Sequence, residues 1–129
     1  MAYEKPIFTQ TFTAGEDLSA KQYHFVKLNA ANSVHVCDTA TDQILGVLQN
    51  APASGEAANV MILGISKLTA GAAIAVGANL SCDTDGKGVT VTIGTDTTTY
   101  VGAVALEAAS AADEVISCLI GGAIAGRAA

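Results

Sequence analysis

Few side chains in this sequence have the chemistry for metal binding: there are two histidines and three cysteines. His35 and Cys37 are a favourable pair, because residues i and i+2 of a strand lie on one face. A zinc site needs a third and a fourth ligand, and the sequence places none beside this pair. We therefore predict no metal site. His24 and His35 each alternate with apolar residues in strand-like runs, so both rings should face away from those neighbours.

The acidic residues offer one partial motif. Asp83-Thr84-Asp85-Gly86 begins like a calcium-binding loop, but that loop needs a glutamate at its twelfth position, where this chain has Gly94. Asp-Gly between two strand-like runs is instead typical of a hairpin turn. Glu107 follows an apolar run, and we expect it either to be partly buried or to cap a turn or contact another chain.

No nucleophile motif is present. The GxSxG frame fails because Lys67 follows Gly64-Ile65-Ser66, and there is no GxxxxGK[ST] phosphate loop. The cysteines, Cys37, Cys82 and Cys118, are odd in number and form no CxxC pair, which favours buried thiols in a reducing compartment. We predict that the protein is not an enzyme and uses no cofactor.

The composition points to contacts with other protein. The chain has 129 residues, a length typical of one domain, and a net charge of -6. Its six basic residues are scattered, which argues against nucleic-acid binding. We find no signal peptide, and the longest apolar run, about a dozen residues, is too short to span a bilayer. Only 14% of residues are charged, so the surface should be rich in alanine, threonine and glycine and suited to lie against protein.

Short apolar runs with a period of two dominate the chain and predict a mostly β fold, a single compact domain built as an all-β sandwich or a barrel-like fold. The expected strands are 23–28, 33–37, 44–48, 59–65, 88–93, 100–106 and 114–120. Little helix is expected. At most one helical turn or an ordered loop fits 106–114, where Ser110 and Asp113 resemble a capping box.

The domain should consist of two similar halves. Thr13-Ala14-Gly15 recurs as Thr69-Ala70-Gly71, 56 residues later, and polar turns followed by alternating valines also recur. We place the repeat units at about 12–66 and 68–121, within one β-rich domain at 12–129. The second copy, LTAGAAIAVG, has almost no polar side chains, so we expect it in the core or in protein-protein contact.

Residues 1–11 are expected to form an extended N-terminal arm. The segment and its junction with the domain carry the predicted binding residues Tyr3, Pro6, Ile7, Phe8 and Phe12. The proline favours extended backbone on either side. Two interpretations stay open: the arm adds a strand to the edge of a neighbour's sheet, or it is a frayed terminus.

Three stretches resemble the capsid cement, or head decoration, proteins of tailed bacteriophages. They are AGEDLSAKQYHFVKL, the central DQILGVLQNAPASGEAANVMILGISKLTAGAAIAVGANLSCDTDGKGV and the closing VGAVALEAASAADEVISCLI. The resemblance covers about residues 12–120 and rests on patterns of small residues. It implies a β-clip-like fold and a structural protein that is made in the bacterial cytoplasm. Such a protein binds the outer surface of the expanded head as a trimer at three-fold positions. It also implies that the arm pairs with the major capsid protein and that the protein staples capsid subunits against DNA pressure.

Two other functions stay open at this point. One is a different virion component, from the tail or a fibre. The other is a β-clip domain that binds a small ligand or carbohydrate, which would need a concave site with convergent polar groups. The terminal GGAIAGRAA, residues 121–129, either packs at a trimer axis or extends freely.

Overall fold

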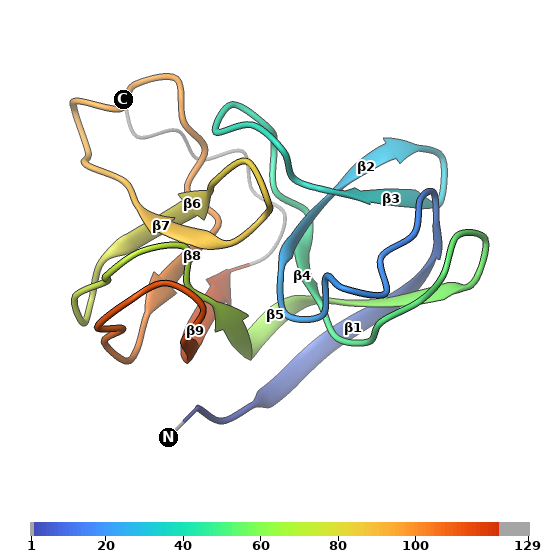
Figure 1. Cartoon of the computed structure of the whole chain (residues 1–129), viewed down its shortest axis with the longest axis horizontal. Helices are drawn as coiled ribbons and strands as arrows, with labels where there is room; N and C mark the ends of the chain where they lie inside the picture. Colours follow the sequence, from blue (N-terminus) through green and yellow to red (C-terminus); the bar gives the residue numbers. More distant parts are fainter. Residues whose placement is uncertain (1, 122–129) are drawn as a thin grey trace.

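The computed structural model describes residues 2–121, which form nine strands and no helix (Figure 1). The prediction of a mostly β domain is therefore confirmed. The strands are β1 (Lys5–Ala14), β2 (Phe25–Ala30), β3 (Ser33–Val36), β4 (Gly46–Leu48), β5 (Ala57–Thr69), β6 (Asn79–Cys82), β7 (Gly88–Thr90), β8 (Ala103–Ala105) and β9 (Val115–Gly121).

The first half of the chain forms a small closed barrel. Its strand order is β1-β3-β2-β4-β5, and a further pairing of β1 with β5 closes the ring. Seven residues of the segment expected as an arm, 5–11, belong to β1, and all of them except Ile7, which lies in a bulge, pair with β5 in this ring. In Figure 1 this barrel is the lobe that carries β2 and β3.

The second half repeats this arrangement and shares β5 with the first. β9, β8, β6 and β7 follow one another from the C-terminal part of β5, and a parallel bridge between Ala70 and Gly88 brings β7 back to the end of β5. Residues 63–65 pair with β1 and also with β9, so these two strands lie on opposite edges of β5. One strand thus serves as the last strand of one barrel and the first strand of the other.

The repeated Thr-Ala-Gly explains the likeness of the halves, because each copy makes the same backbone hydrogen bonds. The N–H of Ala14 donates to the carbonyl of Glu56 at 2.9 Å, and that of Ala70 to Glu114 at 2.8 Å. The next N–H, of Gly15 in one half and Gly71 in the other, donates to the parallel strand, β3 or β7. The expected two similar halves are therefore present, at an offset close to the 56 residues of the sequence repeat.

Two apolar clusters fill the molecule. The smaller one lies inside the first barrel and contains Val26, Leu48 and Val60. The larger one fills the second barrel and continues between the halves, because the residues next to these three, Phe25, Val47 and Met61, point the opposite way and join it. Both faces of the sheet are therefore buried where these strands meet, at 25–26, 47–48 and 60–61, which accounts for the consecutive apolar residues there.

Of the two alternatives for 106–114, the structure has the ordered loop and not the helical turn, because this stretch contains turns and bends and no helix. Ser110 does not pair with Asp113 in a capping box. Its N–H and hydroxyl both bond the Glu114 carboxylate. Asp113 adopts φ 71° and donates its N–H to the carbonyl of Ala70, as Gly55, at φ 84°, does to Ala14 in the first half. The loop is therefore the counterpart of the loop around Gly55.

The other expected strands are present with shifted ends, and two segments differ more. β6 was not predicted, and β5 extends well beyond the predicted 59–65. The second copy of the repeat is divided between two environments: Leu68, Ala70 and Ile74 are buried, whereas Val76 is 68% exposed. The expected tail, except Gly121, lies outside the described residues.

Candidate functional site

The histidines and cysteines, whose side chains could bind a metal or act as nucleophiles, occupy structural positions. The strand expected to contain His24 begins one residue later, and the buried ring donates from Nδ1 to the carbonyl of Asp85, 2.8 Å away. His35 is half-buried on β3 beside Gly15. Cys37 is fully buried in the larger cluster. Within residues 2–121, no three His, Cys, Asp or Glu side chains are grouped as metal ligands would be.

The cysteine thiols are placed where the thiolate is disfavoured. All three are free and buried. Burial raises the pKa of Cys118 to about 12, and the contact with the Cys82 thiol, together with burial, raises the pKa of Cys37. The Cys82 thiol donates to the carbonyl of Thr39. Since the thiolate is the nucleophile, none of these features favours cysteine catalysis.

The acidic turn at 83–86 is a hairpin turn, as its sequence predicts, because β6 and β7 pair as antiparallel neighbours on either side of it. Asp83 stabilises the turn by accepting the N–H groups of Asp85 and Lys87 at 2.8 and 3.0 Å. The Lys87 ammonium forms an ion pair with Asp113, 2.7 Å away, which ties this turn to the loop before β9. Glu107 is half-buried and accepts the N–H of Ser117 at 2.9 Å.

An exposed apolar surface lies across β1, β5 and β9. Phe8 is opposite Leu63 in the β1–β5 ladder, and Leu119 is opposite Ile65 in the β5–β9 ladder. Residues that face each other in antiparallel strands have side chains on the same face. Phe8, Leu63 and Leu119 are 49%, 37% and 44% exposed, and Ile7 in the neighbouring bulge is 74% exposed. We call Ile7, Phe8, Leu63 and Leu119 the β1–β5–β9 patch.

The edge of β1 beside this patch is open. Within residues 2–121, β3 pairs only with Thr13 and Ala14 at the end of β1, and β5 occupies the other edge. The backbone groups of residues 5–12 that point away from β5 therefore have no strand partner in the described part of the chain. A long exposed edge of this kind is a template for an added strand.

The structure separates the five predicted arm residues into three roles. Ile7 and Phe8 belong to the patch, and Pro6 lies opposite Gly64 where β1 crosses β5. Phe12 packs against the smaller core cluster, so it is part of the barrel. Tyr3 precedes β1 and is fixed to β9 through its backbone, which bonds the Ser117 hydroxyl.

Lys67 on β5 makes two contacts next to the start of the chain, an ion pair and a cation–π contact. The Glu4 carboxylate lies 3.7 Å from the ammonium of Lys67 on β5, which also lies 5.7 Å from the centre of the Tyr23 ring. The cation–π arrangement and the ion pair place the lysine between the start of the chain and the loop before β2.

Two patch residues, Leu63 and Leu119, were not predicted from the sequence. Their runs, NVMILGI and EVISCLI, are apolar at almost every position, so no polar alternation marks an outer face. The length of these apolar runs was the available signal for an exposed patch. The apolar residues that the core does not need must lie on the surface.

Both the sequence and the fold of the chain are similar to those of known phage proteins. A family model described as phage cement protein matches residues 4–120. The structure is similar to that of the N base of head fiber gp8.5 from bacteriophage phi29, with a TM-score of 0.63 and 18% sequence identity over 91% of this chain and 97% of that chain. No curated protein matches the chain. No helix in residues 2–121 is long and apolar enough to cross a membrane.

Proposed function

The chain belongs to the phage cement protein family, and we propose that it binds the outer surface of the expanded phage head and staples neighbouring major capsid proteins. It is a phage structural protein of the capsid. The observation that carries the finer proposal is the β1–β5–β9 patch beside the open edge of β1. Apolar side chains on a sheet face and unpaired backbone groups at its edge together suit an extended strand of another protein.

Binding by strand addition explains how a surface with few charged groups can be specific. Backbone hydrogen bonds along residues 5–12 set the register of the added strand, and the exposed Ile7 and Phe8 contact its side chains. We propose that the protein forms a trimer at three-fold positions. Three such binding sites on one trimer raise the effective concentration at which each contact with the capsid forms. A protein that binds only the expanded shell stabilises it by linkage, without catalysis.

The proposed surface is tested by head binding of Leu119→Asp and Ile7→Asp. A charge in the patch should reduce occupancy on heads that lack the protein by about tenfold or more, because the carboxylate loses its water on docking. Ile93→Asp is the matched control, since Ile93 is 53% exposed and lies outside β1, β5 and β9. Normal occupancy of both patch variants, with circular dichroism unchanged, contradicts the proposal.

A head-fibre base is a second candidate, favoured by the similarity to the phi29 head fiber base over nearly all of both chains. Copy number separates the two functions. Quantitative mass spectrometry of purified virions should find hundreds of copies for a cement protein and far fewer for a fibre base. Light scattering of the purified protein tests the trimer, and a monomer in both free and bound states contradicts it.

A further inference from the structure

Cys37 and Cys82 bring one thiol from each half of the chain into contact. Cys37 directly follows β3 and Cys82 ends β6. Both thiols are free, both side chains belong to the larger apolar cluster, and both are almost completely buried. The Cys37 thiol is in hydrogen-bond contact with the Cys82 thiol. Thiols that contact one another meet the first requirement for a disulfide, which joins two sulfur atoms at about 2.05 Å.

Backbone hydrogen bonds hold the two cysteines in this position. The N–H of Cys37 donates to the carbonyl of Phe25 at 3.0 Å, and the N–H of Phe25 donates to the carbonyl of Gly86 at 2.7 Å. Gly86 lies in the turn that connects β6, which ends at Cys82, to β7. The Cys82 thiol donates to the carbonyl of Thr39, 3.0 Å away and two residues after Cys37. The contact between the thiols is therefore fixed from both sides.

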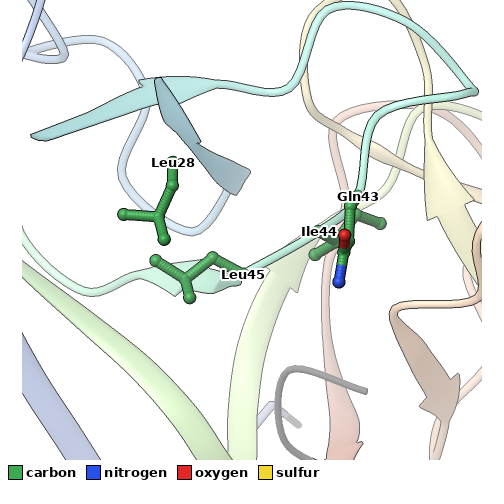
Figure 2. A pocket seen from close by; sticks show the side chains of 4 residues that line it. All are labelled: Leu28, Gln43, Ile44 and Leu45. Atoms are coloured by element: carbon green, nitrogen blue, oxygen red, sulfur yellow. The ribbon is translucent and has the colours of Figure 1, made fainter. Parts of the chain in front are cut away.

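The loop between β3 and β4 contains one of the cysteines and lies against the other. The Asp42 carboxylate holds this loop together by accepting the N–H groups of Asp38 and Thr39 at 2.9 and 3.1 Å. The end of the loop next to β4 is less tightly packed, because a pocket of about 180 Å³ lies beside it (Figure 2). The pocket is lined by Leu28, Gln43, Ile44 and Leu45. Opening of this loop would expose both thiols.

We propose that Cys37 and Cys82 are a modification site, at which a low-molecular-weight disulfide such as oxidised glutathione joins the two halves of the chain by an intramolecular disulfide. One protein thiol attacks oxidised glutathione, which forms a mixed disulfide and releases one reduced glutathione. The other protein thiol then displaces the second. Two S–H bonds break and one S–S bond forms, and two electrons and two protons pass to glutathione. The inference concerns the free protein and does not depend on capsid binding.

The disulfide adds a covalent connection between the halves at a place remote in sequence from β5. It closes a long loop that contains β4 and β5, and a cross-link stabilises a chain more when the loop it closes is long. The reaction of the folded protein should be slow, because both thiols are buried and the loop must open first. Cys118 is equally buried, but it lies on β9 opposite Ser66 and Ala105. It therefore serves as an internal control.

Oxidative refolding of the full-length chain tests the proposal without requiring access to buried thiols. The reduced protein is unfolded in urea and diluted into a mixture of reduced and oxidised glutathione. Peptide mapping by mass spectrometry of the folded product should find Cys37 joined to Cys82 and Cys118 free. The bond should raise the urea midpoint of unfolding, and a reductant should reverse the increase. A folded product that lacks this bond, or that uses Cys118 instead, overturns the proposal.

Oxidation of the folded protein by oxidised glutathione gives a second measurement. The same bond should form slowly, and it should form equally in Cys118→Ser. Cys82→Ser should form no intramolecular disulfide. A bond between Cys37 and Cys118 in the protein with all three cysteines, or a product that contains only glutathione adducts, overturns the proposal.

The rate of this oxidation tests the part played by the loop. Asp42→Asn should accelerate bond formation about fivefold, because the loop opens more often without the carboxylate. Asp96→Asn is the matched control. Its carboxylate also accepts an exposed backbone N–H, that of Thr92 at 2.8 Å, but in the loop after β7. The rate of this control should equal that of the unmodified protein. Equal rates in the two variants overturn the assignment of access to the loop before β4.

Discussion

The Ser117 hydroxyl joins β9 to the backbone of Tyr3, which lies 114 residues earlier in the chain. The N–H of Tyr3 donates to Ser117 Oγ at 2.7 Å, and the hydroxyl donates back to the Tyr3 carbonyl at 3.1 Å. Ser117 is fully buried but Tyr3 is 45% exposed, so both bonds are partly shielded from water. This pair fixes the start of the chain beside the β1–β5–β9 patch, and the orientation of the open β1 edge depends on it.

Ser117→Ala should release the start of the chain. The loss of two partly buried hydrogen bonds costs about 1–3 kcal/mol of unfolding free energy and should accelerate amide exchange at Tyr3. Urea unfolding and hydrogen exchange measure the two effects. Ser54→Ala, at an exposed loop position, is the control. Unchanged exchange at Tyr3 shows that the hydroxyl does not hold the terminus.

Gly64→Ala should damage the crossing of β1 over β5. Gly64 has φ 127°, and an added Cβ lies 2.5 Å from the Lys5 carbonyl oxygen. Gly77→Ala is the matched control, because Gly77 also has positive φ, at 84°, but its Cβ has no neighbour within 4 Å. We expect a loss of about 1 kcal/mol for the control, from backbone strain alone, and about 3 kcal/mol or more for Gly64→Ala. Equal losses argue against a tight crossing.

Acid should weaken the loop that precedes β4. Burial opposes ionisation of Asp42, but the N–H groups of Asp38 and Thr39 and the Lys27 ammonium lower the pKa of Asp42 to about 2, from 3.8. The folded-state pKa lies below the unfolded one, so this stabilisation is complete above about pH 4 and is lost as the pH falls toward 2. The shift corresponds to about 2 kcal/mol.

Asp42→Asn should remove most of this pH dependence, as measured by urea unfolding between pH 2 and 5. Asp38→Asn is the comparison, because Asp38 also contacts the Lys27 ammonium but its side chain is 60% exposed, against 16% for Asp42. Solvent screens the exposed pair, so this variant should lose less stability at pH 7. A larger loss for Asp38→Asn than for Asp42→Asn would reverse the assignment.

A second pH effect should occur nearer neutrality. Burial lowers the pKa of His24 below its ordinary 6.5, while the hydrogen bond to Asp85 partly opposes this. The unfolded state takes up a proton first, so the unfolding free energy should fall as the pH drops below about 6.5. His24→Gln should flatten stability between pH 7.5 and 5.5 without changing the acid transition assigned to Asp42. An identical slope in the variant shows that His24 does not cause it.

The alternating strands of this fold could be predicted from the sequence, as could part of β5, but the sharing of β5 by two barrels could not. SVHV shows a clear period of two and forms β3. β5 serves two barrels, so the buried face changes between Val60 and Met61 and the alternation of apolar residues is interrupted there. β6 was missed for a related reason, because Leu80, Ser81 and Cys82 are all buried.

Two of the four residues of the β1–β5–β9 patch could be predicted from the sequence. Ile7 and Phe8 are recognisable as apolar residues in a short terminal segment with too little chain to form its own core. Phe12 looks the same in the sequence but is placed in the barrel, because the register of β1 on β5 decides which aromatic residue faces inward. Leu63 and Leu119 become neighbours of Phe8 only through the meeting of β1 and β9 across β5, which no local pattern encodes.

The strand shared by the two barrels also determines how the molecule transmits tension. At residues 63–65, β5 pairs with β1 along one edge and with β9 along the other. A force along β5 therefore acts in shear on the hydrogen bonds of both pairings at the same time. A force that separates the two strands of a hairpin from one end would instead break its hydrogen bonds one after another. The halves are connected by continuous backbone through their common strand, so a force between them is carried by covalent bonds as well as by packing.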